Sequence, residues 1–184
     1  MVGWQSLLRN HVMMGFVIVC YITSTVALMC CRMDKKVPLN YILLAVFTMC
    51  VSWMVSIACV RTNPRTVLEA AALTFSMVLA ITVYAATTKT DFTIFGPILF
   101  IVGFVFGMAS ILFGMFGYHP GLGWSIIGVI LFSFYLLFDT QMIMGGDQKR
   151  YQFDEDSYIL AAVALYIDIV NIFMYLLQIL NDSK

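Results

Sequence analysis

Residues 158–180, YILAAVALYIDIVNIFMYLLQIL, decide the fold. The segment is long enough to cross the hydrocarbon core of a bilayer as a helix, which takes about 20 residues. Its one charged residue is Asp168, and Asn171, Tyr175 and Gln178 follow it at +3, +7 and +10. These four residues therefore share one face of a helix whose other faces are apolar. Because a polar stripe is unfavourable against lipid, we expect this helix to lie inside a bundle with Asp168 directed inward.

A second acid, Asp139, lies in the preceding apolar segment, residues 123–144. A charged side chain at the centre of a membrane helix costs roughly 2.5–3.5 kcal/mol on insertion scales, so an acid in such a segment indicates function. Helical spacing places Asp139 on the same face as Gly128 and Tyr135. Asp139 and Asp168 are therefore the candidate functional residues.

The composition of the whole chain agrees with a membrane location. Of its 184 residues, 62% are hydrophobic and 11% charged, whereas a soluble domain has about 45–50% apolar and about 25% charged residues. The formal net charge is zero, and no basic run indicates a nucleic-acid partner. The cysteines lack the spacing of a zinc site or of a disulfide framework, and we interpret them as buried apolar side chains: Cys20, Cys30, Cys31, Cys50 and Cys59.

Polar turns divide the chain into six spans, which predict an all-α membrane protein: one domain, residues 1–184, made of a bundle of six transmembrane helices. The expected spans are residues 11–31, 39–60, 66–87, 92–116, 123–144 and 158–180. Thr66 and Glu69 have the spacing of a capping box at the start of the third span. Gly103 and Gly107 form a motif that lets another helix approach closely.

Basic residues predict the orientation. Six Lys and Arg residues lie on one side of the bilayer and four on the other, and the positive-inside rule places the six-charge side in the cytosol or its equivalent. The six are Arg32, Lys35, Lys36, Lys89, Lys149 and Arg150; the four are Arg9, Arg61, Arg65 and Lys184. Residues 1–9 lack the pattern of a cleavable signal peptide.

Asp139 and Asp168 can meet if the last two spans are antiparallel neighbours. Counted from the span ends, their depths differ by about 8–9 Å, so contact requires that the fifth span extends into the loop or that the sixth begins as a surface turn. Two carboxylates in contact in a low dielectric cannot both ionise easily, so the pair is expected to share a proton and titrate as a unit. Protonated, it would latch the helices together; deprotonated, it would repel or bind a hard cation such as Ca²⁺. Arg32 is the candidate basic partner. The alternative is that the acids only hydrogen-bond the helices together.

Several segments carry a family resemblance. FDTQ at 138–141, followed by YIDIVNIF at 166–173, closely resembles the signature of the transmembrane Bax-inhibitor-motif family, lifeguard branch. The segments CC at 30–31, VPLNY at 37–41 and TKTDFT at 88–93 are also similar to that branch and occur in the same order. The resemblance covers essentially the whole chain.

The resemblance implies a bundle whose last helix is surrounded by the others. It also implies a pH-sensitive calcium leak across an endomembrane, of the endoplasmic reticulum or Golgi, or across the mitochondrial inner membrane. Asp139 and Asp168 would be the sensor and would bind Ca²⁺ transiently as the permeant ion, and Arg32 would be the basic partner. Family members are associated with calcium homeostasis and suppression of cell death. No enzymatic activity and no tightly bound cofactor are expected.

The sequence departs from the family in its number of spans. The family has seven, six are found here, and LLRN at 7–10 is similar to the turn before the family's second helix. We therefore expect the first helix to be absent, so that the chain is a short form or fragment, or another membrane subunit covers the exposed groove. The alternative function is a non-conducting structural subunit of a larger membrane assembly. An intramembrane protease is disfavoured because the Gly-x-Gly-Asp pattern is missing around both aspartates.

Overall fold

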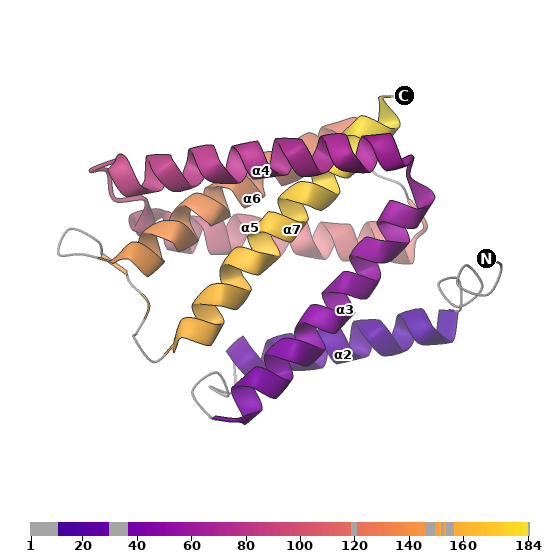
Figure 1. The fold of residues 1–184 in the computed structure, drawn as a ribbon, viewed down its shortest axis with the longest axis horizontal. Helices are drawn as coiled ribbons and strands as arrows, with labels where there is room; N and C mark the ends of the chain where they lie inside the picture. Colours follow the sequence, from indigo (N-terminus) through magenta and orange to yellow (C-terminus); the bar gives the residue numbers. More distant parts are fainter. Residues whose placement is uncertain are drawn as a thin grey trace. The chain divides into compact units, whose positions relative to one another are not determined.

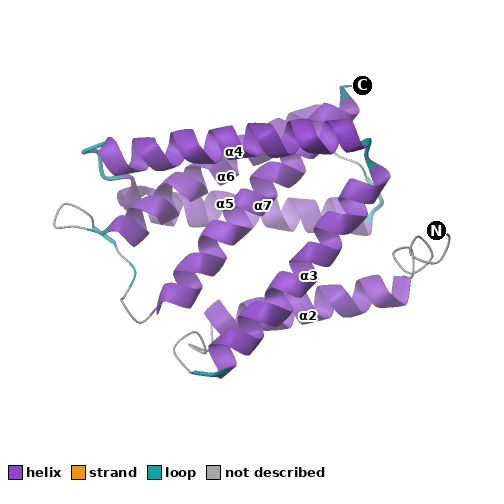
Figure 2. Ribbon diagram, in the orientation of Figure 1, coloured by secondary structure: helices purple, strands orange, loops and turns teal. Residues whose placement is uncertain are grey.

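The structure is a computed structural model that describes residues 11–29, 37–118, 121–145, 150–151, 153 and 157–183. These residues form helices and turns, with no strand among them (Figure 2). The helices in chain order are α2 (His11–Met29), α3 (Leu39–Arg61), α4 (Pro64–Thr87), the short 3₁₀ helix η2 (Phe92–Phe95), α5 (Gly96–Met115), α6 (Leu122–Met144) and α7 (Tyr158–Asp182). The all-helical class predicted from the sequence is confirmed. With η2 and α5 taken together as the fourth segment, the helical segments begin and end within two residues of the expected spans.

Five helical segments are long and apolar enough to cross a bilayer, and they correspond to the last five expected spans. One of the five segments, Phe92–Met115, consists of η2 and α5 together. The apolar part of α2 that the structure describes, Met13–Leu28, is shorter. The two residues that would complete the first expected span, Cys30 and Cys31, lie outside the described residues.

Turn residues explain why the helices end where they do. Asn63 precedes Pro64, and proline is favoured at the first position of a helix, where its missing N–H is not needed. At the other end of α6, Gly145 has a φ of +60° and its N–H donates to the carbonyl of Gln141 at 3.1 Å. This left-handed conformation suits glycine and ends the helix.

The capping box predicted at the start of the third span is wrong. Since α4 begins at Pro64, Thr66 lies inside its first turn instead of at the N-cap position. Glu69 instead forms an ion pair with Arg65, one turn earlier, with Nε and Oε1 3.1 Å apart. Such exposed i, i+4 pairs contribute only about 0.3–0.5 kcal/mol.

The chain divides into two compact units, each described by itself. The first comprises Met1–Asn63 and Asp154–Val163, and in it α2 packs along α3, with Tyr21 stacked on the fully buried Phe47 at a centroid distance of 5.6 Å. The second comprises Pro64–Phe153 and Ala164–Lys184. Within it α6 packs against α4, η2 and α5, and α7 crosses these helices obliquely (Figure 1).

An aromatic cluster joins α5, α6 and α7 in the second unit. Phe106 of α5 is buried and stacks on Trp124 of α6 at 4.2 Å. Tyr175 of α7 contacts Phe106 edge-on and stacks on Phe132 of α6, each at 5.8 Å. This packing determines how α7 lies against its neighbours and therefore positions the polar face of that helix.

Candidate functional site: a carboxyl pair between two helices

Asp139 of α6 and Asp168 of α7 are hydrogen-bonded to each other through their side chains. Both are buried, with 9% and 3% of their surface exposed. A carboxylate only accepts hydrogen bonds, so a bond between two carboxyl groups requires that one of them carries a proton. The two carboxyl groups expected from the sequence to meet therefore lie within hydrogen-bonding reach, an arrangement that a shared proton would stabilise.

The two acids lie in the same compact unit, although the first residues of α7, up to Val163, belong to the other unit. Asp168 lies ten residues after the start of α7 at Tyr158, and Asp139 lies five residues before the end of α6 at Met144. α6 ends at its expected residue, and α7 begins as a helix with Ile159 buried instead of as a surface turn. Neither of the two conditions expected for contact is therefore met in the form predicted from the sequence.

Tyr135, one turn before Asp139 on α6, is a further titratable group beside the pair. Its phenol ring lies close enough to Asp139 and Asp168 to interact electrostatically with both. Its hydroxyl donates to the carbonyl of Leu99 on α5 at 2.7 Å. Gly103 makes room for this arrangement, because a Cβ there would overlap the Tyr135 hydroxyl. Of the expected Gly103–Gly107 motif, only Gly103 lies at a close contact with another helix. A Cβ at Gly107 would have open space around it.

One oxygen of the pair has no partner in the described residues. Asp168 Oδ2 is buried and makes no hydrogen bond. A buried polar atom without a partner is costly, typically about 1–3 kcal/mol, and such atoms indicate functional positions. The oxygen can accept a hydrogen bond from water or contribute to the coordination of a cation.

The rest of the predicted polar stripe has mixed roles. Tyr175 packs against Gly128 of α6, where a Cβ would lie 2.7 Å from the ring, and its hydroxyl is hydrogen-bonded to Ser110 of α5. Asn171 donates to the carbonyl of Ile167 in its own helix at 2.8 Å. Gln178 is partly buried. Tyr175 is therefore the member of the stripe that contacts α5 and α6 besides Asp168. Asn171 and Tyr175 follow Asp168 at three and seven residues along α7.

The sequence reasoning missed Gln141, which lies two residues after Asp139 and is fully buried. Its Oε1 accepts from the N–H of Phe92 at 2.8 Å, and its Nε2 donates to the carbonyl of Thr90 at 3.0 Å. This side chain clamps the end of α6 to the turn between α4 and η2. An amide near the end of an apolar helix is the signal that could have indicated it.

The same turn is held by Asp91, at the N-cap of η2. Its Oδ1 accepts from the N–H of Thr93 at 3.0 Å and from the Thr93 hydroxyl at 2.6 Å. Its Oδ2 accepts from the N–H of Arg150 at 3.0 Å. Asp91 therefore ties part of the loop after α6 to the turn that Gln141 holds.

Two sequence predictions about ligands remain without a structural outcome. Arg32, the candidate basic partner, lies outside the described residues. Among the residues that are described, no three or more His, Cys, Asp and Glu side chains gather where they could hold a metal ion. A cation at the carboxyl pair would be bound by two protein carboxyl groups and by other oxygen atoms.

The comparison with known proteins agrees with this geometry. The family model described as "Inhibitor of apoptosis-promoting Bax1" matches residues 1–184. The chain belongs to this family. With its apolar helices, this membership makes the chain an integral membrane protein.

Relatives within the family come from plants and animals. Protein LIFEGUARD 4 of Arabidopsis thaliana is 40% identical over 156 residues, 82% of this chain and 60% of the relative. Protein LIFEGUARD 2 of the same plant is 34% identical over 91% of the chain and 71% of the relative. Protein lifeguard 3 of Homo sapiens is 26% identical over 89% of the chain and 54% of the relative. The chain thus spans about three fifths of the length of the first of these.

Proposed function

We propose that this chain forms a pH-sensitive leak for Ca²⁺ across an endomembrane, with Asp139 and Asp168 as the sensor. The observation that carries the proposal is the buried hydrogen bond between these two carboxyl groups, which come from different helices. A contact that exists only while a proton is shared is a two-state element, and proton binding can shift its equilibrium.

The direction of the pH effect follows from the charge of the pair. At low pH the shared proton holds the carboxyl groups together and with them α6 and α7. As the pH rises, the proton is lost and two negative charges face each other in a low dielectric, which favours separation of the helices. We therefore expect the flux of Ca²⁺ to rise with pH. Tyr135 is the other titratable group that faces the pair among the described residues.

Calcium suits the deprotonated site as the transported ion. Ca²⁺ prefers oxygen ligands, and carboxylates are the strongest of these in proteins. The two carboxylates would attract it, and the unpartnered Asp168 Oδ2 is already available as a ligand. With few further protein ligands among the described residues, binding would be weak, which is what passage through a leak requires.

A role in suppressing cell death is part of the same proposal. It is supported by the family description, which names inhibition of a death-promoting protein, and by the lifeguard names of the relatives. Leak of Ca²⁺ from an internal store provides a physical route to such a role, because it lowers the amount of Ca²⁺ that the store can release.

The test is Ca²⁺ flux from liposomes that contain the purified full chain, at about pH 6 and about pH 8, on either side of the range in which a shared carboxyl proton is lost. Asp168→Asn keeps a hydrogen-bonding group but cannot titrate, so its flux should be low and equal at both pH values. Asp182→Asn, an exposed acid at the end of the same helix, should retain the wild-type rise. Unchanged pH dependence in Asp168→Asn would refute the sensor assignment.

An absence of flux has a separate meaning. If the folded wild-type chain conducts at neither pH, the leak proposal fails. The alternative of a non-conducting structural subunit then stands, and stoichiometric membrane partners should co-purify with the chain in mild detergent. Flux from liposomes containing the chain alone would exclude the need for such partners.

A further inference from the structure

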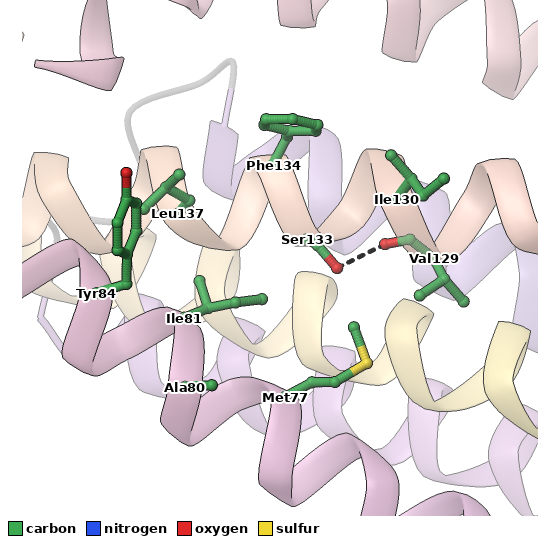
Figure 3. Close-up of a pocket in the computed structure, with 9 residues that line it drawn as sticks. All are labelled: Met77, Ala80, Ile81, Tyr84, Val129, Ile130, Ser133, Phe134 and Leu137. Carbon is green, nitrogen blue, oxygen red and sulfur yellow. Dashed lines mark hydrogen bonds between the residues drawn. The ribbon is translucent and has the colours of Figure 1, made fainter. Parts of the chain in front are cut away.

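Two apolar grooves flank α6 in the second unit and share Phe134, which is 51% exposed. The first has a volume of about 390 Å³ and lies between α4 and α6, with Met77 and Ile81 of α4 and Val129 and Leu137 of α6 among its lining residues (Figure 3). The second has a volume of about 280 Å³ and is lined by Ile98, Leu99 and aromatic side chains of η2 and α6. Since these helices span the bilayer, grooves with exposed apolar walls open toward lipid.

Both grooves are almost entirely apolar. In the first, the Ser133 hydroxyl donates to the carbonyl of Val129 at 2.7 Å, and the Tyr84 hydroxyl is the other polar side-chain group of the lining (Figure 3). The second is lined by Phe92, Phe95, Ile98, Leu99, Phe134 and Phe138, which carry no polar side-chain atom. The chemistry of both grooves therefore fits hydrocarbon chains.

The first groove is somewhat shorter than the hydrocarbon of one leaflet. Along α4 it runs from Met77 to Tyr84, and along α6 from Val129 to Leu137, which correspond to about 10 Å and about 12 Å of helix. One leaflet contributes about 15 Å of hydrocarbon. The groove ends at Tyr84, three residues before the end of α4 at Thr87, and tyrosine is enriched where the bilayer meets water.

Both grooves end at the same place. The ring of Tyr84, at the end of the first, contacts the ring of Phe92, in the second, at a centroid distance of 6.0 Å. Between these residues the chain makes the turn that contains the exposed Lys89. Asp91 holds the backbone of Arg150 against this turn at 3.0 Å. The exposed side chain of Lys89 and the backbone of Arg150, whose guanidinium lies over the ring of Tyr151 at 5.6 Å, are therefore at the common end. The carboxylate of Asp91 accepts three hydrogen bonds there.

We propose that the two grooves bind one anionic diacyl phospholipid. One acyl chain lies between α4 and α6, the other lies against η2 and α5, and Phe134 separates them. The headgroup phosphate lies at the turn, where Lys89 and Arg150 attract it, since basic side chains next to a membrane surface favour anionic lipid. The shared Phe134 and the common end are the reasons for assigning both chains to one molecule. This site does not depend on the proposed Ca²⁺ leak.

The experiment is native mass spectrometry of the full chain in detergent with added phosphatidylglycerol or phosphatidylcholine. The wild-type chain should retain one phosphatidylglycerol and should bind it in preference to phosphatidylcholine. Ala80→Trp fills the first groove and Ile98→Trp the second, and each should weaken retention by at least about tenfold, because burial of an acyl chain sums over many methylenes. Leu79→Trp and Ile101→Trp, exposed neighbours that line neither groove, should retain wild-type binding.

Two comparisons test the parts of the proposal separately. Lys89→Gln should reduce the preference for the anionic lipid, whereas Arg61→Gln, an exposed cation outside the unit that holds the grooves, should not. On the wild-type chain, a single-chain lysophosphatidylglycerol should bind at least about tenfold more weakly than the diacyl lipid. Equal binding of the two would overturn the assignment of both grooves to one molecule. Equal loss in Leu79→Trp and Ala80→Trp would overturn the site itself.

Discussion

Replacing Gln141 by Leu isolates the contribution of the clamp between α6 and the turn before η2. The change keeps the approximate size of the side chain and removes both of its hydrogen bonds, at 2.8 Å to the N–H of Phe92 and at 3.0 Å to the carbonyl of Thr90. Both partners are backbone groups, which are fixed in the turn and which leucine cannot bond.

The expected destabilisation is about 1–3 kcal/mol. Hydrogen bonds between membrane helices contribute about 0.6 kcal/mol on average and up to about 1.7 kcal/mol, and two are lost here. Leaving a buried N–H or C=O without a partner costs about 1–3 kcal/mol. Phe92 is half-buried and Thr90 is exposed, so only part of this cost adds to the loss of the two bonds. Water can reach the turn from the membrane surface and bond the two backbone groups. The expected loss of stability therefore stays within about 1–3 kcal/mol.

The assay is unfolding of the purified chain in detergent, with Trp4 and Trp53 replaced by Phe so that the fluorescence reports on Trp124, which stacks on Phe106 in the same unit. Asn171→Leu is the matched control. It removes the same amide from a neighbouring helix, but the bond lost is to Ile167 in its own helix, so its cost should stay below about 0.6 kcal/mol. Equal stability of the two variants would refute the argument that the clamp joins separate elements.

Three further changes test the packing around the site by the same assay or by proteolysis. Gly128→Ala should destabilise the chain by about 1–3 kcal/mol, because its Cβ would lie 2.7 Å from the ring of Tyr175; Tyr175→Leu should remove most of this cost, and strictly additive effects would contradict the contact. Tyr135→Phe should cost about 0.5–1.5 kcal/mol through loss of the bond to Leu99, and unchanged stability would show that the hydroxyl is not needed there. Asp91→Ala should speed tryptic cleavage after Arg150 severalfold, because it frees the backbone of that residue; Asp182→Ala should leave the rate unchanged.

The helices could be predicted because each is an apolar run of suitable length between polar turns. Pro64 and Gly145 show how local chemistry determines a boundary, since each suits the helix end at which it stands. Thr66 shows the limit of such reasoning. Thr66 and Glu69 have the spacing of a capping box, but the helix begins two residues earlier, at Pro64, because proline is favoured at the first position of a helix.

Asp139 and Asp168 could be singled out as candidates from the sequence, because charge is rare in membrane helices. Their approach could not be derived in the same way, since counting residues from the span ends places them at different depths, whereas the structure brings their side chains together. The clamp of Gln141 escaped prediction because its partners lie 49 and 51 residues away in the chain and are backbone groups without a side-chain signature.

The clamp also determines which helix can move. Gln141 anchors the end of α6 to the turn, and the N–H of Phe153 donates to the carbonyl of Met142 at 3.1 Å, so this end is held on both sides of its last turn. Among the described residues of α7, the amide next to Asp168, Asn171, is bonded within its own helix, and the aromatic and hydroxyl contacts to α5 and α6 lie further along, at Tyr175. If deprotonation makes the two carboxylates repel, as proposed, the displacement should therefore fall on the part of α7 around Asp168, while the end of α6 stays in place. Distances from spin labels on α4 should then change with pH when they are measured to α7 and stay constant when they are measured to the end of α6.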